Sequence, residues 1–468
     1  NQTPFLVFMH ARYDQYYIEN LSALREWSSG EETIYTRKLL IVDEAPNLMK
    51  VSKLSTSVIA ACEGMISTYK PSYELGWDKP KQTLLSTLNY SLRIPFQKLL
   101  RQYKANGSRI AMATSDDFNA AACENSVLLD PFCDQLERYA GPRSDEIIET
   151  VSVLSKQPAA YQIGQEHELT VPHCRLFDIR DDLHTFILSG SAFLSPELYE
   201  NPEVDIHPAV VQESYQRLTI HVQRSDTRFS VSKTAMANKT TRNVLTVWLK
   251  NKLSGMAGHK VLVVTYKGYA KELWDALSEF HDRLIPLQAD DNSGPKESLP
   301  YFGGMNGSNR YNEADCVICA GLGRFDSEEY FNRALAFDFD GSAWGEFEQA
   351  CLDPSFRNTD DLACVQKMRN LTMARDLVQL VFRSTLRNHG GKEPVSLWLI
   401  QPPEEVVMHV RESFRDCQHD EISELPFECL SELAARRTFQ GKPTHASKLL
   451  KWLADWDGSP ILIAEVQG

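Results

Sequence analysis

Two adjacent carboxylates follow a short apolar run near the start of the chain, in the stretch LLIVDEAPNL. The run 39–42 is short and continuously apolar, which is typical of a buried strand, and Asp43 and Glu44 come at its end. Carboxylate oxygens bind Mg²⁺ directly or through water, and a second acid can polarise an attacking water molecule. The alternative is an acid that only caps the next helix. The pair favours a magnesium-dependent hydrolytic site.

Three polar side chains share one face of a helix predicted over 371–388. Arg383 and Arg387 are four residues apart, and Gln379 lies one turn earlier. A guanidinium that reaches a phosphate stabilises the charge that develops during phosphoryl transfer. The alternative is two solvated arginines on a surface helix.

A polar turn and a serine pair could contact phosphates or link sites. The turn Gly307-Ser308-Asn309 can bring backbone N–H groups and an amide close to a phosphate of a nucleotide or nucleic acid, or it can be a plain polar turn. Ser189 and Ser191 end a predicted strand in the stretch LSGSA. Their hydroxyls can form hydrogen bonds that link neighbouring sites, or they can satisfy backbone groups at the strand end.

The bulk composition limits the classes of protein to consider. The 468 residues are enough for two or three domains, and 43% hydrophobic with 24% charged residues is typical of a globular protein. The net charge of −14 argues against a protein that coats nucleic acid, but an enzyme needs only a local basic channel. No apolar run has the roughly 20 residues that span a bilayer, and the start NQTPFLVFMH is unlike a signal peptide, so we expect a cytoplasmic protein.

The ten cysteines are widely scattered and show no disulfide framework. Cys316 and Cys319 form a C-x-x-C pair, but inside the apolar run ADCVICAGL. On a strand, residues i and i+3 point to opposite faces. We therefore expect two thiols in or beside a buried strand and no metal site there.

Short apolar runs alternate with helical patterns in two parts of the chain, which predicts an α/β protein with parallel strands covered on both faces. The predicted organisation is a first domain over 1–50 and 166–200, a helical insertion over 51–165, a second domain over 210–405, and a mostly helical extension over 406–468. The predicted strands lie within 4–10, 37–45, 173–179, 184–192, 217–223, 259–268, 314–322 and 396–402.

The order of these segments resembles that of the motifs of superfamily 2 helicases and translocases, the DEAD/DEAH-like class. Asp43-Glu44-Ala45-Pro46 is similar to motif II, and LSGSA (188–192) to motif III. The further similarities are FLVFMHARY (5–13) to motif Ia, VLVVTYK (261–267) to motif IV, 301–322 to motif V and QLVFRSTLR (379–387) to motif VI. The resemblance implies two RecA-like domains with parallel sheets that bind ATP and Mg²⁺ in the cleft between them.

The resemblance also implies roles for the residues at matching positions. Asp43 would organise Mg²⁺, Glu44 would act as the hydrolytic base, and Arg383 would be the arginine finger. Ser189 and Ser191 would couple the nucleotide to the nucleic acid. Arg387, Gln379, Gly307 and Asn309 would complete the nucleotide site. DNA or RNA, expected to be single-stranded, would contact His10, Arg12, Thr265, Lys267, Ser308 and Asn309.

The chain departs from this family in three places. Motif VI has Phe382 where the family has glycine and carries its second arginine one residue late, and motif II ends in Pro46. No phosphate-binding stretch G-x-x-x-x-G-K-[ST] occurs. Either this P-loop belongs to a segment outside the chain, or the protein is an inactive helicase-like scaffold that binds nucleic acid or, through the helical insertion, a protein partner. An unrelated α/β enzyme whose paired acids bind a metal is the remaining alternative.

Overall fold

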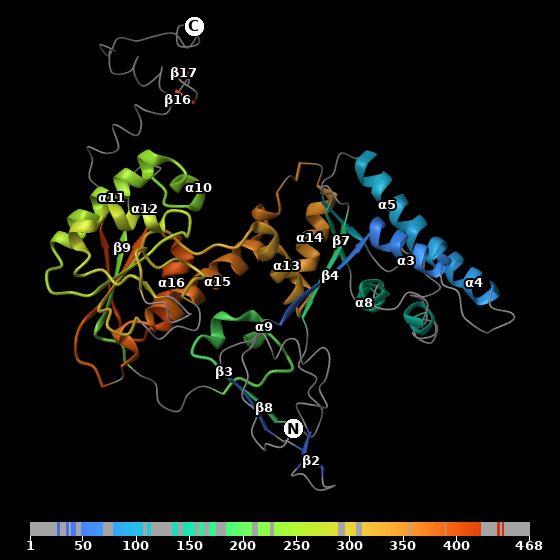
Figure 1. Cartoon of the computed structure of the whole chain (residues 1–468), viewed down its shortest axis with the longest axis horizontal. Helices are drawn as coiled ribbons and strands as arrows, with labels where there is room; N and C mark the ends of the chain where they lie inside the picture. Colours follow the sequence, from blue (N-terminus) through green and yellow to red (C-terminus); the bar gives the residue numbers. More distant parts are fainter. Residues whose placement is uncertain are drawn as a thin grey trace. The chain divides into compact units, whose positions relative to one another are not determined.

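Two units, each combining helices with β-sheet, make up the chain in the computed structural model (Figure 1). Unit 1 comprises Asn1–His207 and Phe325–Arg369, and unit 2 comprises Pro208–Arg324 and Asn370–Gly468. The structure describes residues 26–28, 34–36, 39–43, 48–68, 78–105, 110–113, 133–138, 144–154, 159–162, 168–174, 184–207, 214–224, 229–288, 295–305, 311–353, 355–356, 358–388, 390–422, 438–439 and 442–443.

A five-stranded parallel sheet organises unit 2, with its strands in the order β10-β13-β14-β9-β15. Every residue of β10 and β13 is buried, as continuous apolar runs predict for strands covered on both faces. The first four of these strands overlap the apolar runs predicted as strands in this part of the chain. The bounds are β9 (Leu218–Gln223), β10 (Val261–Val264), β13 (Cys316–Cys319), β14 (Val395–Ile400) and β15 (Gln418–Ile422).

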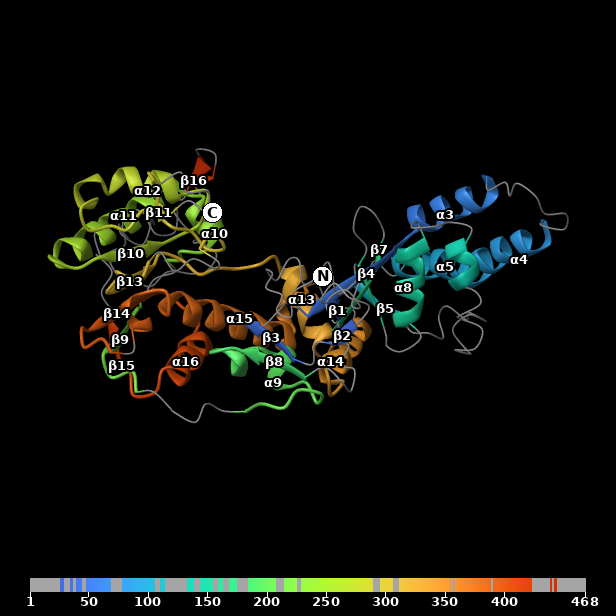
Figure 2. The ribbon, with the colours of Figure 1, turned by 60° about the horizontal axis from the view of Figure 1, so that its bottom comes forward.

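Helices cover both faces of this sheet. Helices α11 (Lys239–Ser254) and α12 (Ala270–Ala276) pack on one face, and α16 (Glu404–Ser413) lies on the other side (Figures 1 and 2). A short helix, α10 (Lys233–Met236), precedes α11. The side chains of Ser232 and Asn238 accept hydrogen bonds from Ala235 N and Thr240 N and so cap α10 and α11.

Unit 1 contains a four-stranded antiparallel sheet that the sequence did not predict. Three of its strands lie largely in the segment 51–165, which was expected to be helical. Strand β4 pairs along its whole length with β7, so the sheet depends on contacts between residues far apart in the sequence. In the order β4-β7-β6-β5, the strands are Met49–Ser55, Glu168–Cys174, Ala159–Gln162 and Ile110–Ala113.

The predicted helices of the insertion are present beside this sheet. A π-helical turn, η1 (Asn89–Arg93), separates α4 (Asp78–Leu88) from α5 (Ile94–Ala105). It ends two residues before Pro95, which lacks the N–H that a regular α-helical hydrogen bond requires. The buried residues Leu84, Leu88, Leu92, Phe96 and Leu99 form one apolar face across the turn. Helices α3 (Thr56–Thr68) and α8 (Asp145–Leu154) complete this core.

Residues 325–369 belong to unit 1, whereas the sequence placed them inside the second domain, 210–405. Their apolar side chains share a core with Leu48 and Leu198, and the rings of Phe331 and Phe347 meet edge to face at 5.0 Å. The helices here are α13 (Ser327–Ala336), α14 (Ser342–Leu352), η5 (Thr359–Asp361) and the start of α15 (Ala363–Val381), which ends in unit 2.

In the part of the chain that the structure describes, no helix is long and apolar enough to cross a membrane. Several short elements complete this part of the chain. The pair β3 (Leu39–Asp43) and β8 (His184–Leu188) is parallel. The other short elements are β1 (Glu26–Ser28), β2 (Ile34–Thr36), η3 (Ala192–Leu194), α9 (Pro196–Tyr199), η4 (Ser278–Phe280), β11 (Leu287–Gln288), β12 (Pro295–Lys296), η6 (Thr385–Arg387), β16 (Thr438–Phe439) and β17 (Lys442–Pro443).

Candidate functional site

Strand β3 leads into the carboxylate pair and lies beside β8 in parallel register. Asp43 is paired with Leu188, so both strands end at the same edge. The backbone that continues from Asp43 therefore starts next to the backbone that continues to Ser189. The side chain of Asp43 and the whole of Glu44 lie outside the described residues.

The predicted burial of β3 is wrong at Ile41, the residue of this strand whose side chain the structure describes. The side chain of Ile41 is 59% exposed, and that of Phe186, its partner on β8, is 54% exposed. Within the residues that the structure describes, β3 and β8 form a two-stranded sheet. A sheet of this width exposes apolar side chains that the continuous run in the sequence predicted as core.

The two serines after β8 contact backbone groups. The Ser189 hydroxyl accepts a hydrogen bond from Ser191 N at 3.4 Å. Ser191 is buried, and its carbonyl accepts from Leu194 N at 3.0 Å in the turn that starts η3. Both residues lie at the edge where β3 ends, and Ser189 here satisfies a strand-end backbone group, which was one of the two predicted alternatives.

At the carboxyl end of β10, Thr265 and Lys267 have different surroundings. Thr265 is completely buried, and its hydroxyl donates to Ala320 O at 3.3 Å, so its side chain does not reach a ligand at the surface. Lys267 is exposed, and its Nζ lies 5.8 Å from the centre of the Tyr301 ring. Of the two residues predicted here for nucleic-acid binding, the structure leaves only Lys267 accessible.

The carboxyl end of β13 lies next to Tyr266. The buried tyrosine hydroxyl accepts from Leu322 N at 3.3 Å, and burial raises the pKa of Tyr266. Gly321 has a φ of +122°, and a Cβ at that position would lie 2.7 Å from the Tyr266 ring. Only glycine therefore fits here. The motif V turn Gly307-Ser308-Asn309 lies outside the described residues.

The C-x-x-C pair is structural, as predicted. Cys316 and Cys319 occupy the two ends of β13 and are buried. Burial raises the pKa of the Cys319 thiol to about 12, and burial and the nearby Asp315 carboxylate raise the pKa of Cys316. Among the residues that the structure describes, no group of three or more His, Cys, Asp or Glu side chains is arranged to hold a metal ion.

The arginines of motif VI do not lie on one helix, contrary to the prediction. Helix α15 ends at Val381, and a separate 3₁₀ turn spans Thr385–Arg387. The Ser384 hydroxyl caps this turn by accepting from Leu386 N at 3.2 Å, which favours the break. Gln379 remains on α15, Arg383 is half-buried after it, and Arg387 is exposed on the 3₁₀ turn.

Residues 382–388 and 390–391, which we call the arginine-bearing turn, lie at the amino end of the parallel sheet. Thr385 N donates to Ala314 O at 2.8 Å, and Ala314 precedes β13. Lys267 follows β10 and so lies at the opposite, carboxyl end. Strand β13 has four residues, and each strand residue spans about 3.3 Å. Lys267 and the arginine-bearing turn are therefore separated by roughly 13 Å along the strands.

Sequence reasoning missed Arg217, which organises the arginine-bearing turn. Its Nη2 atom donates to Thr385 O at 3.0 Å and to Leu386 O and Asn388 O at 2.7 Å each. Arg217 immediately precedes β9, far from motif VI in the sequence. The run RLTIHVQ gave no local signal for this contact, because the partners are backbone carbonyls and not a charged side chain.

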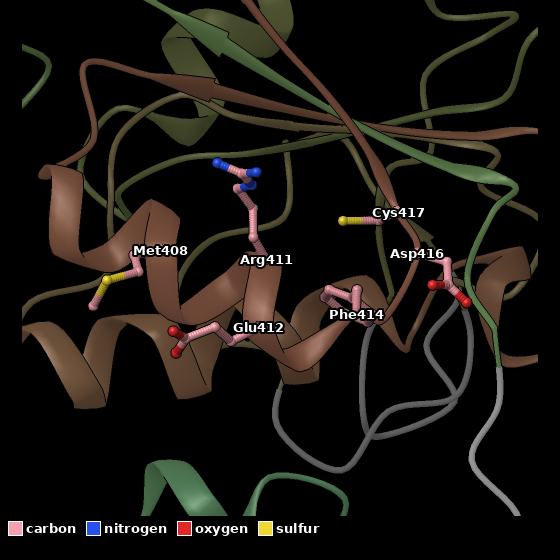
Figure 3. A pocket seen from close by; sticks show the side chains of 6 residues that line it. All are labelled: Met408, Arg411, Glu412, Phe414, Asp416 and Cys417. Atoms are coloured by element: carbon pink, nitrogen blue, oxygen red, sulfur yellow. The ribbon is translucent and has the colours of Figure 1, made fainter.

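A hollow of about 390 Å³ lies at the carboxyl end of α16. The Arg411 side chain extends into it from α16, and the Cys417 side chain extends into it from the residue before β15 (Figure 3). None of the predicted site residues lines it, so we do not assign the predicted chemistry to it. Its lining residues are Met408, Arg411, Glu412, Phe414, Asp416 and Cys417.

The predicted site residues thus fall into three sets. Asp43 and the serines share one edge in unit 1, whereas Lys267 and the motif VI arginines occupy opposite ends of the sheet in unit 2. His10, Arg12, Glu44 and the motif V turn lie outside the described residues. Comparison with known proteins adds no assignment, since no protein-family model and no curated protein matches this sequence.

Proposed function

We propose that this chain is the core of an ATP-dependent helicase or translocase that moves along DNA or RNA. The observation that carries the proposal is the parallel pairing of β3 with β8, in which Asp43 stands opposite Leu188. The strands are separated in sequence by an entire antiparallel sheet and its helices. Their common end supports the expectation that a metal-binding acid and the coupling serines act together, as in superfamily 2.

The paired acids fit a magnesium-dependent hydrolysis of ATP. Asp43 and Glu44 offer only carboxylate oxygens, which are the donors that Mg²⁺ prefers. Bound Mg²⁺ would offset negative charge on the phosphates. Asp43 would hold the ion, while Glu44 would orient and deprotonate the attacking water. The position of Asp43 at the end of β3 supports such a role, because in-line attack requires fixed geometry.

The separation of the two groups in unit 2 supports two different ligands. Lys267, with the Tyr301 ring beneath it, offers a cation and an aromatic surface at the carboxyl edge, which is a combination suited to a nucleic-acid strand. Arg383 and Arg387 at the amino edge would reach the phosphates of ATP, where a guanidinium stabilises the transition state. The five-stranded parallel sheet supports a RecA-like fold for unit 2.

The test is ATP turnover with and without single-stranded DNA or RNA, measured for the natural chain and for Glu44→Gln. The assay is run on this chain alone and with any natural sequence that precedes Asn1 restored, because no phosphate-binding loop occurs in residues 1–468. We expect strand-stimulated turnover that Glu44→Gln lowers by at least about 100-fold, since the water loses its base. Binding of ATP should persist in the variant.

A matched variant separates hydrolysis from nucleic-acid binding. Lys267→Ala should retain basal turnover and lose part of the stimulation by the strand. If neither form of the protein binds or hydrolyses ATP while the strand still binds, the motor is refuted and a helicase-like scaffold is supported. If turnover is present but insensitive to Glu44→Gln, the assignment of the acid pair is refuted.

A further inference from the structure

We infer that Arg217, together with Tyr215, is a positioning element that holds the arginine-bearing turn. The geometry concerns unit 2 alone. The catalytic meaning of the inference rests on the proposed function, because it depends on Arg383 and Arg387 contacting phosphate. Neither Arg217 nor Tyr215 is among the motif residues that the resemblance implies.

The Arg217 guanidinium binds the carbonyls at the end of the turn. Its Nη2 atom donates to Thr385 O, Leu386 O and Asn388 O within 2.7–3.0 Å, and Nη1 donates to Glu393 O at 3.4 Å. Thr385 O and Asn388 O also accept from Asn388 N and Gly391 N, so the guanidinium reinforces the hydrogen bonds of the turn itself. Charged donors form stronger hydrogen bonds than neutral ones, so this single side chain fixes the backbone on both sides of Arg387.

The chain makes room for this guanidinium with a glycine. A Cβ at Gly391 would lie 2.8 Å from Arg217 Nη1 and 3.0 Å from Asn388 O. The Gly391 N–H also donates to Asn388 O at 2.8 Å, which closes the turn beneath the guanidinium. Any larger residue would displace the Arg217 side chain from the carbonyls that it binds.

The other side of Arg383 is held by aromatic packing. Phe382 contacts Tyr215 at 5.8 Å and Phe414 at 5.3 Å between ring centres, and Tyr215 contacts Phe414 at 5.2 Å. The phenylalanine that replaces the glycine of motif VI therefore has a structural purpose. Arg383 therefore lies between two sets of contacts. Tyr215 packs on Phe382 before it, and Arg217 binds the backbone carbonyls that follow it.

This segment is itself fixed to the sheet. The Arg217 carbonyl accepts from Val395 N at 2.8 Å, at the start of β14, and Tyr215 N donates to Arg415 O at 2.8 Å. Through their contacts, Tyr215 and Arg217 thus fix the arginine-bearing turn to the parallel sheet. We expect Arg217 to affect the rate of the chemical step through Arg383 and Arg387, with little effect on ATP affinity.

Hydrogen–deuterium exchange of peptides that cover the arginine-bearing turn tests the structural part without nucleotide. Arg217→Ala should speed exchange of the amides in this turn by at least about 10-fold, because their ordering depends on the lost guanidinium. The matched control is Arg283→Ala, which removes one arginine–carbonyl bond of 2.9 Å, to Leu253 O, elsewhere in unit 2. Unchanged exchange of the turn in Arg217→Ala would overturn the inference.

A kinetic cycle tests the positioning role. Arg217→Ala should lower kcat at saturating ATP by at least about 10-fold, and ATP affinity should stay within about threefold. In a background that already carries Arg383→Ala and Arg387→Ala, the same change should alter kcat by less than about twofold. An equal loss in both backgrounds would show that Arg217 acts through overall stability and would overturn the inference.

Arg217→Lys is the second variant, since it keeps the positive charge but has no planar fork to spread over separate carbonyls. For Arg217→Lys we expect an amide exchange rate in the arginine-bearing turn, and a kcat, that lie between those of the natural protein and those of Arg217→Ala. An exchange rate and a kcat equal to those of the control variant Arg283→Ala would overturn the inference. If the natural protein neither binds nor hydrolyses ATP, the proposed function fails, and the exchange experiment alone then decides whether Arg217 orders the turn.

Discussion

Three glycines of unit 2, with Gly258 before β10, Gly268 after it and Gly321 after β13, offer a graded test of why Gly321 must be glycine. Gly268 has an ordinary φ, and a Cβ there would meet nothing within 4 Å. Gly258 has a φ of +87° and equally open surroundings. Gly321 combines a φ of +122° with Tyr266 ring atoms at 2.7–2.9 Å from the added Cβ. Alanine therefore adds no strain at Gly268 and backbone strain at Gly258. At Gly321 it adds both backbone strain and a steric clash.

The expected losses of unfolding free energy follow from these terms. Gly268→Ala should stay within about 0.5 kcal/mol of the natural protein, as surface changes do. Gly258→Ala should cost about 1 kcal/mol for the positive φ. Gly321→Ala should cost about 3 kcal/mol or more, since overpacking adds to the strain and the Tyr266 ring cannot retreat without losing the bond from Leu322 N.

Native-state hydrogen exchange of the β10 and β13 amides measures all three variants on one scale. A loss of about 3 kcal/mol corresponds to exchange that is faster by roughly 150-fold, at 1.4 kcal/mol per factor of ten. Double replacement with Tyr266→Ala should remove the clash and leave the strain. If Gly321→Ala costs no more than Gly258→Ala, the close approach of Tyr266 does not constrain this edge, and our explanation of the glycine is refuted.

Three further predictions concern titration and binding. Because burial raises the pKa of Cys319 to about 12 and also raises that of Cys316, iodoacetamide at pH 8.5 should label both thiols at least about 10-fold more slowly in the native protein than in urea, as read by mass spectrometry. His221, which stacks on Trp398 and contacts Asp420 at 2.6 Å, has a pKa lowered mainly by burial, so the unfolded chain binds its proton more readily. Unfolding free energy should therefore fall as pH drops below about 6.5, and His221→Gln should flatten this slope in urea titrations. Lys267→Ala should weaken single-strand binding in fluorescence anisotropy and reduce its salt slope by about 1, whereas Thr265→Val should leave binding unchanged.

The sequence predicted the strands whose signals are local. The apolar runs around β10, β13 and β14 gave strand positions to within a few residues, because burial on both faces requires uninterrupted apolar side chains. These strand positions follow from the identity of neighbouring residues alone. The parallel pairing of β3 with β8 joins segments far apart in the sequence and does not follow from local signals.

Features that depend on distant partners were not predictable in this way. Thr265 reads as a polar residue at a strand end, but its hydroxyl is bound to Ala320 O inside the core. Arg387 reads as a continuation of α15, but the Ser384 cap and the carbonyl contacts of Arg217 favour a separate turn. The strands of unit 1 were missed because β4 and β7 are paired across a long stretch of chain. In each case a tertiary contact overrides the local pattern.

Strand β13 defines how the two candidate ligand sites of unit 2 relate to each other. Its residues are buried and hydrogen-bonded to β10 on one side and β14 on the other, so its length fixes a spacing of about 13 Å between the edges. Gly321 follows one end of the strand, and Ala314, which binds the arginine-bearing turn, precedes the other. A list of motif residues in sequence order hides this separation, because segments before and after a strand look adjacent. In a parallel sheet they lie at opposite edges, so we propose different ligands for Lys267 and for Arg383 with Arg387, and separate assays test the two groups.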